Sequence, residues 1–128
     1  MPATLAPMSH IAEMLPEKMM DSLVKEVGKT RADLGVRTEL VALAVNPENG
    51  GKGIGGKMTQ LSYDLMKKEG FLFSYAECGC VYSEKAIIKQ GGKIENKWDY
   101  ATFEYNGTKP FETMPAPHTG CSLVVTRF

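Results

Sequence analysis

The sequence predicts an α/β fold, a mixed sheet with a central parallel strand-helix-strand unit. Two apolar runs, Leu40–Val45 and Phe71–Ala76, flank a helical pattern over Met58–Lys68. Parallel strands need a crossover connection, and a helix between two strands in this length supplies a right-handed one. The order of these three elements therefore gives the fold class.

Each element of this unit has a local reason. Leu40–Val45 is apolar at every position, which is typical of a strand covered on both faces. The following helix carries apolar residues at helical spacing, and Gly70 is placed to end it. The side chains expected to face the core are Met58, Leu61, Leu65 and Met66.

The C-terminal part continues with alternating elements. We expect a short helix over Ser83–Gln90, capped by the Ser83 hydroxyl, and a long strand over Lys93–Tyr105. Asn106-Gly107 predicts a turn, and Pro110–Pro117 predicts a loop. A last strand is expected over Ser122–Phe128.

Length and composition favour one globular domain spanning residues 1–128. The chain has 128 residues, 43% of them hydrophobic, and a formal net charge of zero. This balance gives no basis for binding nucleic acid or a membrane surface. We expect residues 1–14 to be a loose segment, a helix to start at Pro16, and the protein to be cytoplasmic.

The chain contains three cysteines, and two of them stand close together as Cys78-Gly79-Cys80. There is no second pair to complete a zinc site. We therefore expect ordinary buried thiols and no metal.

The glycine-rich stretch Gly50–Gly56 is the most informative segment for function. It lies between an apolar run and a helix, where backbone N–H groups and the positive end of a helix dipole favour a phosphate. The stretch fits G-x-G-x-x-G, and Glu77 follows about twenty residues later, as in a dinucleotide site. However, several residues separate the strand from the first glycine, and Met58 replaces the hydroxyl residue of a P-loop. A connector that binds nothing is the remaining alternative.

A strand ending in V-x-P, a glycine loop, a helix, a strand and a short helix resembles the GNAT superfamily of N-acetyltransferases. The loop matches R/Q-x-x-G-x-G/A, except that Gly50 stands where Arg or Gln is usual. The short helix matches a K-x-G-F ending, with Gly92 in place of the aromatic residue. Tyr82-Ser83, Trp98-Asp99-Tyr100, Phe111 and Pro115–Thr119 are similar to insect and nematode arylalkylamine N-acetyltransferases.

This resemblance implies acetyl-CoA as the acyl donor and a small primary amine as the acceptor. Ser83 then matches a serine proposed for proton handling in the family, while Gly79 leaves the position of a second serine vacant. Tyr82 either donates to the thiolate sulfur or packs. Residues lining the pantetheine arm would be Leu43, Ala44 and Val45. The diphosphate would lie on the backbone of Gly51, Lys52, Gly53, Ile54, Gly55 and Gly56, with added charge from Lys52 or Lys57.

The resemblance spans Leu15–Phe128, and the family's first strands and helices have no counterpart before it. We therefore expect a partial fold in which residues 40–45 form an exposed apolar edge, a feature that favours a homodimer. Two alternatives to an active enzyme stay open. One is a catalytically silent module for CoA binding or dimerisation, and the other is a dinucleotide-binding fragment.

Overall fold

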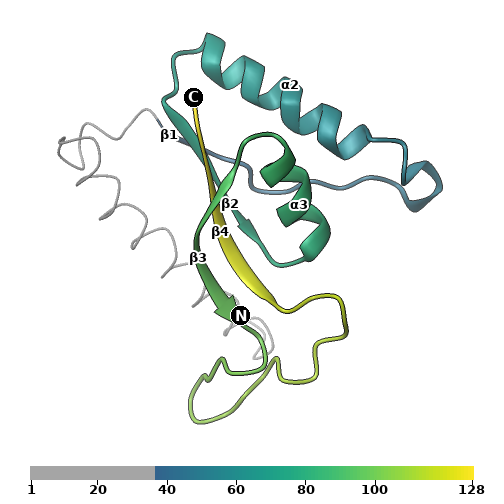
Figure 1. The fold of residues 1–128 in the computed structure, drawn as a ribbon, viewed down its shortest axis with the longest axis vertical. Helices are drawn as coiled ribbons and strands as arrows, with labels where there is room; N and C mark the ends of the chain where they lie inside the picture. Colours follow the sequence, from purple (N-terminus) through teal and green to yellow (C-terminus); the bar gives the residue numbers. More distant parts are fainter. Residues whose placement is uncertain (1–36) are drawn as a thin grey trace, which may run out of the picture.

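The computed structural model describes residues 37–128, which form a four-stranded mixed sheet with two helices packed on one face (Figure 1). The strands are β1 (Arg37–Glu39), β2 (Phe73–Cys78), β3 (Lys93–Asp99) and β4 (Gly120–Arg127), in the spatial order β1-β2-β4-β3. The helices are α2 (Ile54–Lys68) and α3 (Val81–Lys89). Strands β1 and β2 are parallel and the other pairs are antiparallel, so the predicted mixed sheet is confirmed. The expected loose segment 1–14 and the helix from Pro16 lie outside the described residues.

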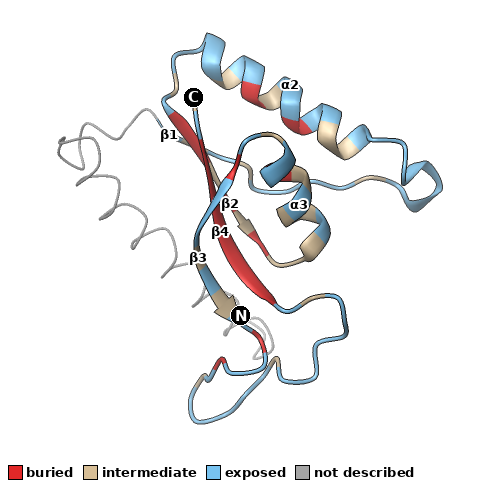
Figure 2. Ribbon diagram, in the orientation of Figure 1, coloured by how far each residue is buried: buried red, intermediate tan, exposed pale blue. Residues whose placement is uncertain are grey.

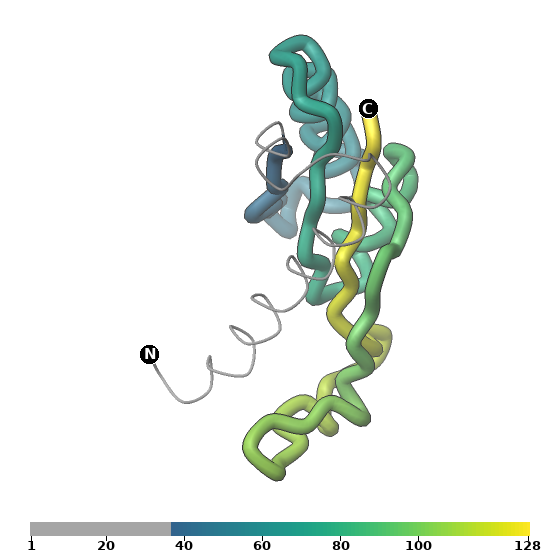
Figure 3. The backbone as a smooth tube through the Cα atoms, turned by 90° about the vertical axis from the view of Figure 1, so that its left-hand side faces the viewer, coloured from purple at the N-terminus to yellow at the C-terminus, as the bar shows by residue number. Residues whose placement is uncertain are grey.

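Strand β4 is the centre of the fold because it is paired on both sides. Its residues Gly120–Thr126 are buried, and Leu123 and Val124 have no exposed surface (Figure 2). Alternation of its side chains divides the core between the two faces of the sheet. Val124 packs with the helices, whereas Leu123 and Val125 pack with aromatic residues of segment 100–119. That segment projects beyond one end of the sheet (Figure 3).

The predicted strand Leu40–Val45 is wrong in position. Strand β1 covers Arg37–Glu39, and only Leu40 continues the pairing, by donating its N–H to the Tyr75 carbonyl at 3.0 Å. Residues 41–46 run without strand structure, and Val41 keeps 82% of its surface exposed. Continuous apolar character indicates burial on two faces, yet within residues 37–128 nothing covers the outer edge of this segment.

Other boundaries also differ from the prediction, and two of these differences bear on the site. The strand predicted over Lys93–Tyr105 ends at Asp99, where the chain turns into the aromatic segment. Helix α3 starts at Val81, two residues before the predicted start, so Ser83 lies inside the helix and is not its cap. The turn at Asn106-Gly107 is confirmed, since both residues have positive φ and Tyr105 and Thr108 pair across them.

Helix α2 turns a different face to the core than its apolar spacing predicts. The buried residues are Thr59 and Tyr63. Of the four side chains predicted to face the core, Met66 packs against it, while Met58, Leu61 and Leu65 are exposed. Tyr63 reaches the central strand, where its hydroxyl accepts a hydrogen bond from Thr126 Oγ1 at 3.0 Å. Burial raises the pKa of Tyr63 despite this bond. Gly70 follows the end of the helix as predicted, with φ of 86°.

The two faces of α2 can be compared by truncation. Tyr63→Ala should lower the free energy of unfolding by about 3 kcal/mol, because it leaves a cavity in place of a buried ring and removes the hydrogen-bond acceptor of the Thr126 hydroxyl. Leu61→Ala, on the exposed face, should cost less than about 1 kcal/mol. Urea denaturation of both variants checks this, and equal losses would contradict the packing described.

Candidate active site

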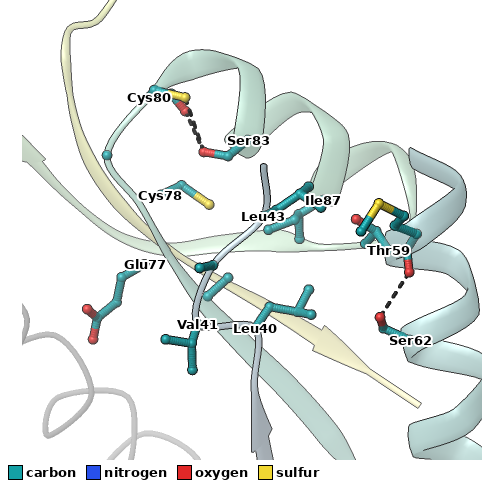
Figure 4. Close-up of a pocket in the computed structure, with 14 residues that line it drawn as sticks. Leu40, Val41, Leu43, Thr59, Ser62, Glu77, Cys78, Cys80, Ser83 and Ile87 are labelled. Atoms are coloured by element: carbon teal, nitrogen blue, oxygen red, sulfur yellow. Dashed lines mark hydrogen bonds between the residues drawn. The ribbon is translucent and has the colours of Figure 1, made fainter. Parts of the chain in front are cut away.

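A cavity of about 420 Å³ lies where β1 and β2 separate (Figure 4). It is lined by four segments of the chain. They are residues 40–43 after β1, three residues of α2 (Met58, Thr59 and Ser62), residues 76–80 at the end of β2, and two residues of α3, Ser83 and Ile87. These segments are adjacent only in the folded chain, so the cavity is a product of the crossover topology.

The divergence of the two strands exposes backbone groups to this cavity. Tyr75 accepts from Leu40, so the N–H and C=O of Tyr75 point toward β1. Because these directions alternate along a strand, the next residue of β2 with the same direction is Glu77. No residue of β1 pairs with Glu77, so its backbone faces the gap. A ligand lying in the gap can pair there in place of a strand.

The glycine loop leads directly from this gap into α2. Gly51 and Gly53 both have φ of 74°, a conformation that side chains rarely allow, and Gly53 is the N-cap of the helix. The first helical hydrogen bond joins the Lys57 N–H to the Gly53 carbonyl at 3.0 Å. The preceding N–H groups, of residues 54–56, therefore have no acceptor within the helix. This is an arrangement that can bind an anion.

The loop and the segment after β1 are in contact. A Cβ built on Gly55 would lie 3.6 Å from Leu43 Cδ2 and 3.7 Å from Val45 Cγ2. Leu43 lines the cavity, whereas Ala44 and Val45 do not. Ile54, Gly55, Gly56 and Lys57 belong to the first turn of α2, although the sequence predicted them as loop. Residues 51–57 lie beside the cavity and Met58 begins its wall.

The two predicted proton-handling residues are placed differently. Ser83 lines the cavity, and its hydroxyl donates to the Cys80 carbonyl at 3.0 Å. Tyr82 is 66% exposed and does not line the cavity, and its ring packs edge-on against His118. His118 in turn accepts the Val81 N–H through Nδ1 at 3.3 Å, so it anchors the start of α3. The structure brings Ser83 to the cavity and leaves Tyr82 beside it.

Two thiols in the cavity wall have opposite properties. Burial raises the pKa of Cys78 to about 11. Burial also opposes ionisation of Cys80, but hydrogen bonds with Ser83 and with the backbone of Tyr82 lower the pKa of Cys80 overall. Cys80 Sγ lies 3.4 Å from Ser83 Oγ at the start of α3. Sequence spacing alone did not single out Cys80, because its environment depends on the helix start.

Among the described residues, Glu77 is the one acidic residue in the cavity lining. Burial, together with the nearby charge of Glu39, raises the pKa of Glu77 to about 7. Glu39 itself accepts a hydrogen bond from the Tyr75 hydroxyl at 3.2 Å. The sequence had placed Glu77 only in a dinucleotide pattern, and its position beside the strand gap gives it a different chemical setting.

No family model matches the chain. Several solved structures do resemble it. A mosquito arylalkylamine N-acetyltransferase-like protein 5b aligns over 89% of this chain and 51% of its own, at 24% identity and TM-score 0.67. The Drosophila melanogaster polyamine N-acetyltransferase, which forms N-acetylagmatine, aligns over 98% and 65%, at 20% identity and TM-score 0.63. A Bacillus subtilis acetyltransferase in complex with CoA aligns over 71% and 61%, at 17% identity and TM-score 0.52.

The chain has a partial GNAT fold. It spans about half to two thirds of the length of these three proteins. In the described sheet only the pair β1–β2 is parallel. Dinucleotide-binding domains instead have a parallel, doubly wound sheet. Within residues 37–128 no helix is long and apolar enough to cross a membrane, and no three His, Cys, Asp or Glu side chains group as a metal site.

The cavity thiols allow a chemical test of this geometry. Iodoacetamide should label Cys80 before Cys78 and Cys121 in the folded protein, because Cys80 is less buried and has the lower pKa. Ser83→Ala should slow labelling of Cys80 at pH 7.5, since a hydrogen bond that favours the thiolate is removed. Peptide mass spectrometry gives the rate at each cysteine.

Ser62→Ala is the matched control, since this serine also lines the cavity but bonds the Met58 carbonyl. Its labelling rate should equal that of the unmodified sequence. Equal labelling of all three cysteines under native conditions would contradict the arrangement.

Proposed function

We propose that the protein is an acetyl-CoA-dependent N-acetyltransferase that acts on a small primary amine of the arylalkyl class. The single observation that carries this proposal is the cavity in the strand gap, adjoined by a helix start whose N–H groups are available to an anion. The GNAT fold of the chain and the CoA complex of the Bacillus subtilis protein support the same assignment.

The residues present fit this group. When bound, acetyl-CoA supplies an acetyl thioester, whose carbonyl carbon is open to attack by an amine. The backbone of Gly51–Gly56 would hold the diphosphate, and Lys52 and Lys57 flank it. Both lysines are exposed and donate hydrogen bonds to neighbouring amide side chains, Lys52 to Asn49 and Lys57 to Gln60, from which they can turn toward a phosphate. Residues 43–45 would border the arm of the carrier.

Ser83 is the better supported of the two proposed proton-handling residues. It lines the cavity, and its hydroxyl is already oriented by the Cys80 carbonyl. To stabilise a departing thiolate by hydrogen bonding, its single proton would have to turn from the Cys80 carbonyl to the sulfur. Tyr82 would have to leave its contact with His118 to do so.

A catalytically silent CoA-binding module is the alternative. Gly50 and Gly92 depart from the family pattern, and Gly79 occupies a position where the family has a serine. A Cβ on Gly79 would lie 3.3 Å from the Tyr100 hydroxyl, which bonds the Gly79 carbonyl at 2.6 Å. The Tyr100 hydroxyl therefore occupies the space where the side chain of a serine at position 79 would begin.

Titration calorimetry with CoA tests the glycine loop. Gly55→Glu should weaken binding at least tenfold, because it introduces a negative charge where an anion would bind. Gly55→Ala is the matched control for shape, since its added methyl meets Leu43 and Val45 at ordinary contact distances. Gly55 is preferred to Gly53, where the positive φ would strain any side chain. Unchanged affinity in Gly55→Glu would remove the loop from the proposal.

The same protein incubated with acetyl-CoA and tyramine should release N-acetyltyramine and free CoA thiol. Chromatography of the amide product distinguishes an active N-acetyltransferase from a catalytically silent CoA-binding module. CoA binding with no amide would leave the silent module as the function of this chain.

We also propose a homodimer through the exposed segment 40–45. Strand β1 is an edge of the described sheet, and Val41 and Leu43 are exposed beside it. An open apolar edge favours pairing with another chain. Val41→Lys should shift sedimentation toward the monomer, because a lysine there opposes edge pairing. Ile88→Lys on α3, also exposed, is the control, and a monomeric unmodified protein at high concentration would contradict the dimer.

A further inference from the structure

Two cysteines lie in one wall of the cavity. Cys78 is the last residue of β2 and Cys80 is the N-cap of α3, with only Gly79 between them. Both line the cavity, and Figure 4 shows both beside Ser83. The backbone of Cys80 is extended, with φ of −134° and ψ of 152°. Because side chains two residues apart in an extended chain point the same way, the two thiols face the same space.

Backbone hydrogen bonds hold the turn that joins the two cysteines. The Gly79 carbonyl accepts a hydrogen bond from the Tyr100 hydroxyl at 2.6 Å. The Cys80 carbonyl accepts the Glu84 N–H at 3.2 Å, at the start of α3. These bonds position the turn without using a sulfur atom, so a reaction at sulfur need not break them.

The spacing of the two cysteines suits a disulfide. Two steps along an extended chain cover about 6.6 Å. Cα atoms joined by a disulfide lie roughly 4.4 to 6.8 Å apart, and the glycine between the cysteines lets the chain adjust. All three cysteines of the chain lie within residues 37–128, and Cys121 packs in the core on the opposite face of the sheet. Cys78 is therefore the partner that Cys80 can reach within one chain.

The two thiols have different surroundings. Cys78 is buried with Ile87 in the helix-side core, and this burial raises its pKa to about 11. Cys80 is only partly buried, and its Sγ lies 3.4 Å from the Ser83 Oγ. Burial alone would raise the pKa of Cys80, but hydrogen bonds with Ser83 and with the backbone of Tyr82 lower it overall. The sequence predicts ordinary buried thiols, and Cys80 departs from that prediction. Since the thiolate is the nucleophile in disulfide exchange, Cys80 is the attacking thiol.

We infer that Cys78 and Cys80 form a redox pair that reduces a small disulfide entering the cavity. The Cys80 thiolate attacks one sulfur of that disulfide, forms a mixed disulfide with it and releases the other sulfur as a thiolate. Cys78 then loses its proton and attacks the Cys80 sulfur, which closes the Cys78–Cys80 disulfide and releases the second thiolate. Two electrons pass from the cysteines to the small disulfide, and the two protons that the cysteines lose end on the released thiols. This activity goes beyond the proposed acetyl transfer and does not require it.

Two reagents offer the same chemistry, CoA disulfide and glutathione disulfide. Only the first carries diphosphate groups, which the start of α2 is suited to bind. We therefore expect CoA disulfide to react at least tenfold faster than glutathione disulfide. This preference alone rests on the CoA binding proposed above.

Oxidation of the reduced protein tests the pair. One equivalent of CoA disulfide at pH 7.5 should oxidise both thiols and release two equivalents of CoA. The tryptic peptide of residues 69–85 contains Cys78 and Cys80 but not Cys121, so its mass should fall by that of two hydrogens. Dithiothreitol should reverse the change.

Single variants separate the two steps. Cys78→Ser should trap the mixed disulfide, so that the protein keeps the mass of one bound CoA, and Cys78→Ala repeats this test without a buried hydroxyl. Cys80→Ser should slow the reduction of CoA disulfide at least tenfold, because only buried thiols remain. Cys121→Ser is the matched control, since Cys121 is also buried but does not line the cavity, and its rate should equal that of the unmodified sequence.

Two results would overturn the redox pair. One is a mixed disulfide that persists in the unmodified sequence, because Cys78 would then not reach Cys80. The other is a reaction at Cys121 as fast as that at Cys80, because the cavity would then give no selectivity. Equal rates with the two small disulfides would support the pair and remove only the preference for CoA.

Discussion

Leu40 donates the last backbone hydrogen bond that joins β1 to β2, at 3.0 Å to Tyr75, and the arrangement of the cavity follows from its position. If the strands continued in register, the gap beside Glu77 would be closed by ladder hydrogen bonds. Because they do not, β2 presents backbone groups and alternating side chains to an open space. The same departure carries the chain over α2, where Leu43 and Val45 contact the glycine start of the helix. The contact of this segment with the glycine start of α2 and the cavity therefore have one origin.

The parallel unit and two turns that contain glycine could be predicted, because their signals are local. Gly70 and Asn106-Gly107 adopt the positive φ that their positions suggest. The strand at Leu40–Val45 could not be placed, because an apolar run indicates burial without saying which partner provides it. The buried face of α2 failed for a related reason. Thr59 and Tyr63 are polar, and their place in the core depends on hydrogen bonds to Gly55 and Thr126, which no periodicity in the helix reveals.

The residues of the candidate site also differ in how far the sequence reveals them. The glycine loop and Ser83 could be found from sequence, since each belongs to a contiguous motif. Ser83 was nevertheless expected as a helix cap, and the structure places it in the cavity wall. Cys80 and Glu77 gained no such role from sequence. The lowered pKa of Cys80 arises from the turn that begins α3, and the raised pKa of Glu77 arises from a carboxylate on another strand. Both effects require the folded arrangement.

The position of Glu77 carries a cost in stability that depends on pH. Its folded-state pKa of about 7 lies above the usual value of a glutamate. The folded state therefore binds a proton more tightly than the unfolded chain, and the free energy of unfolding falls as pH rises from about 4 to 7. A glutamine there would avoid this loss, because it has no charge to desolvate. A carboxyl group that is partly buried near Glu39, where β1 no longer pairs with β2, therefore makes the fold less stable at neutral pH than at acidic pH.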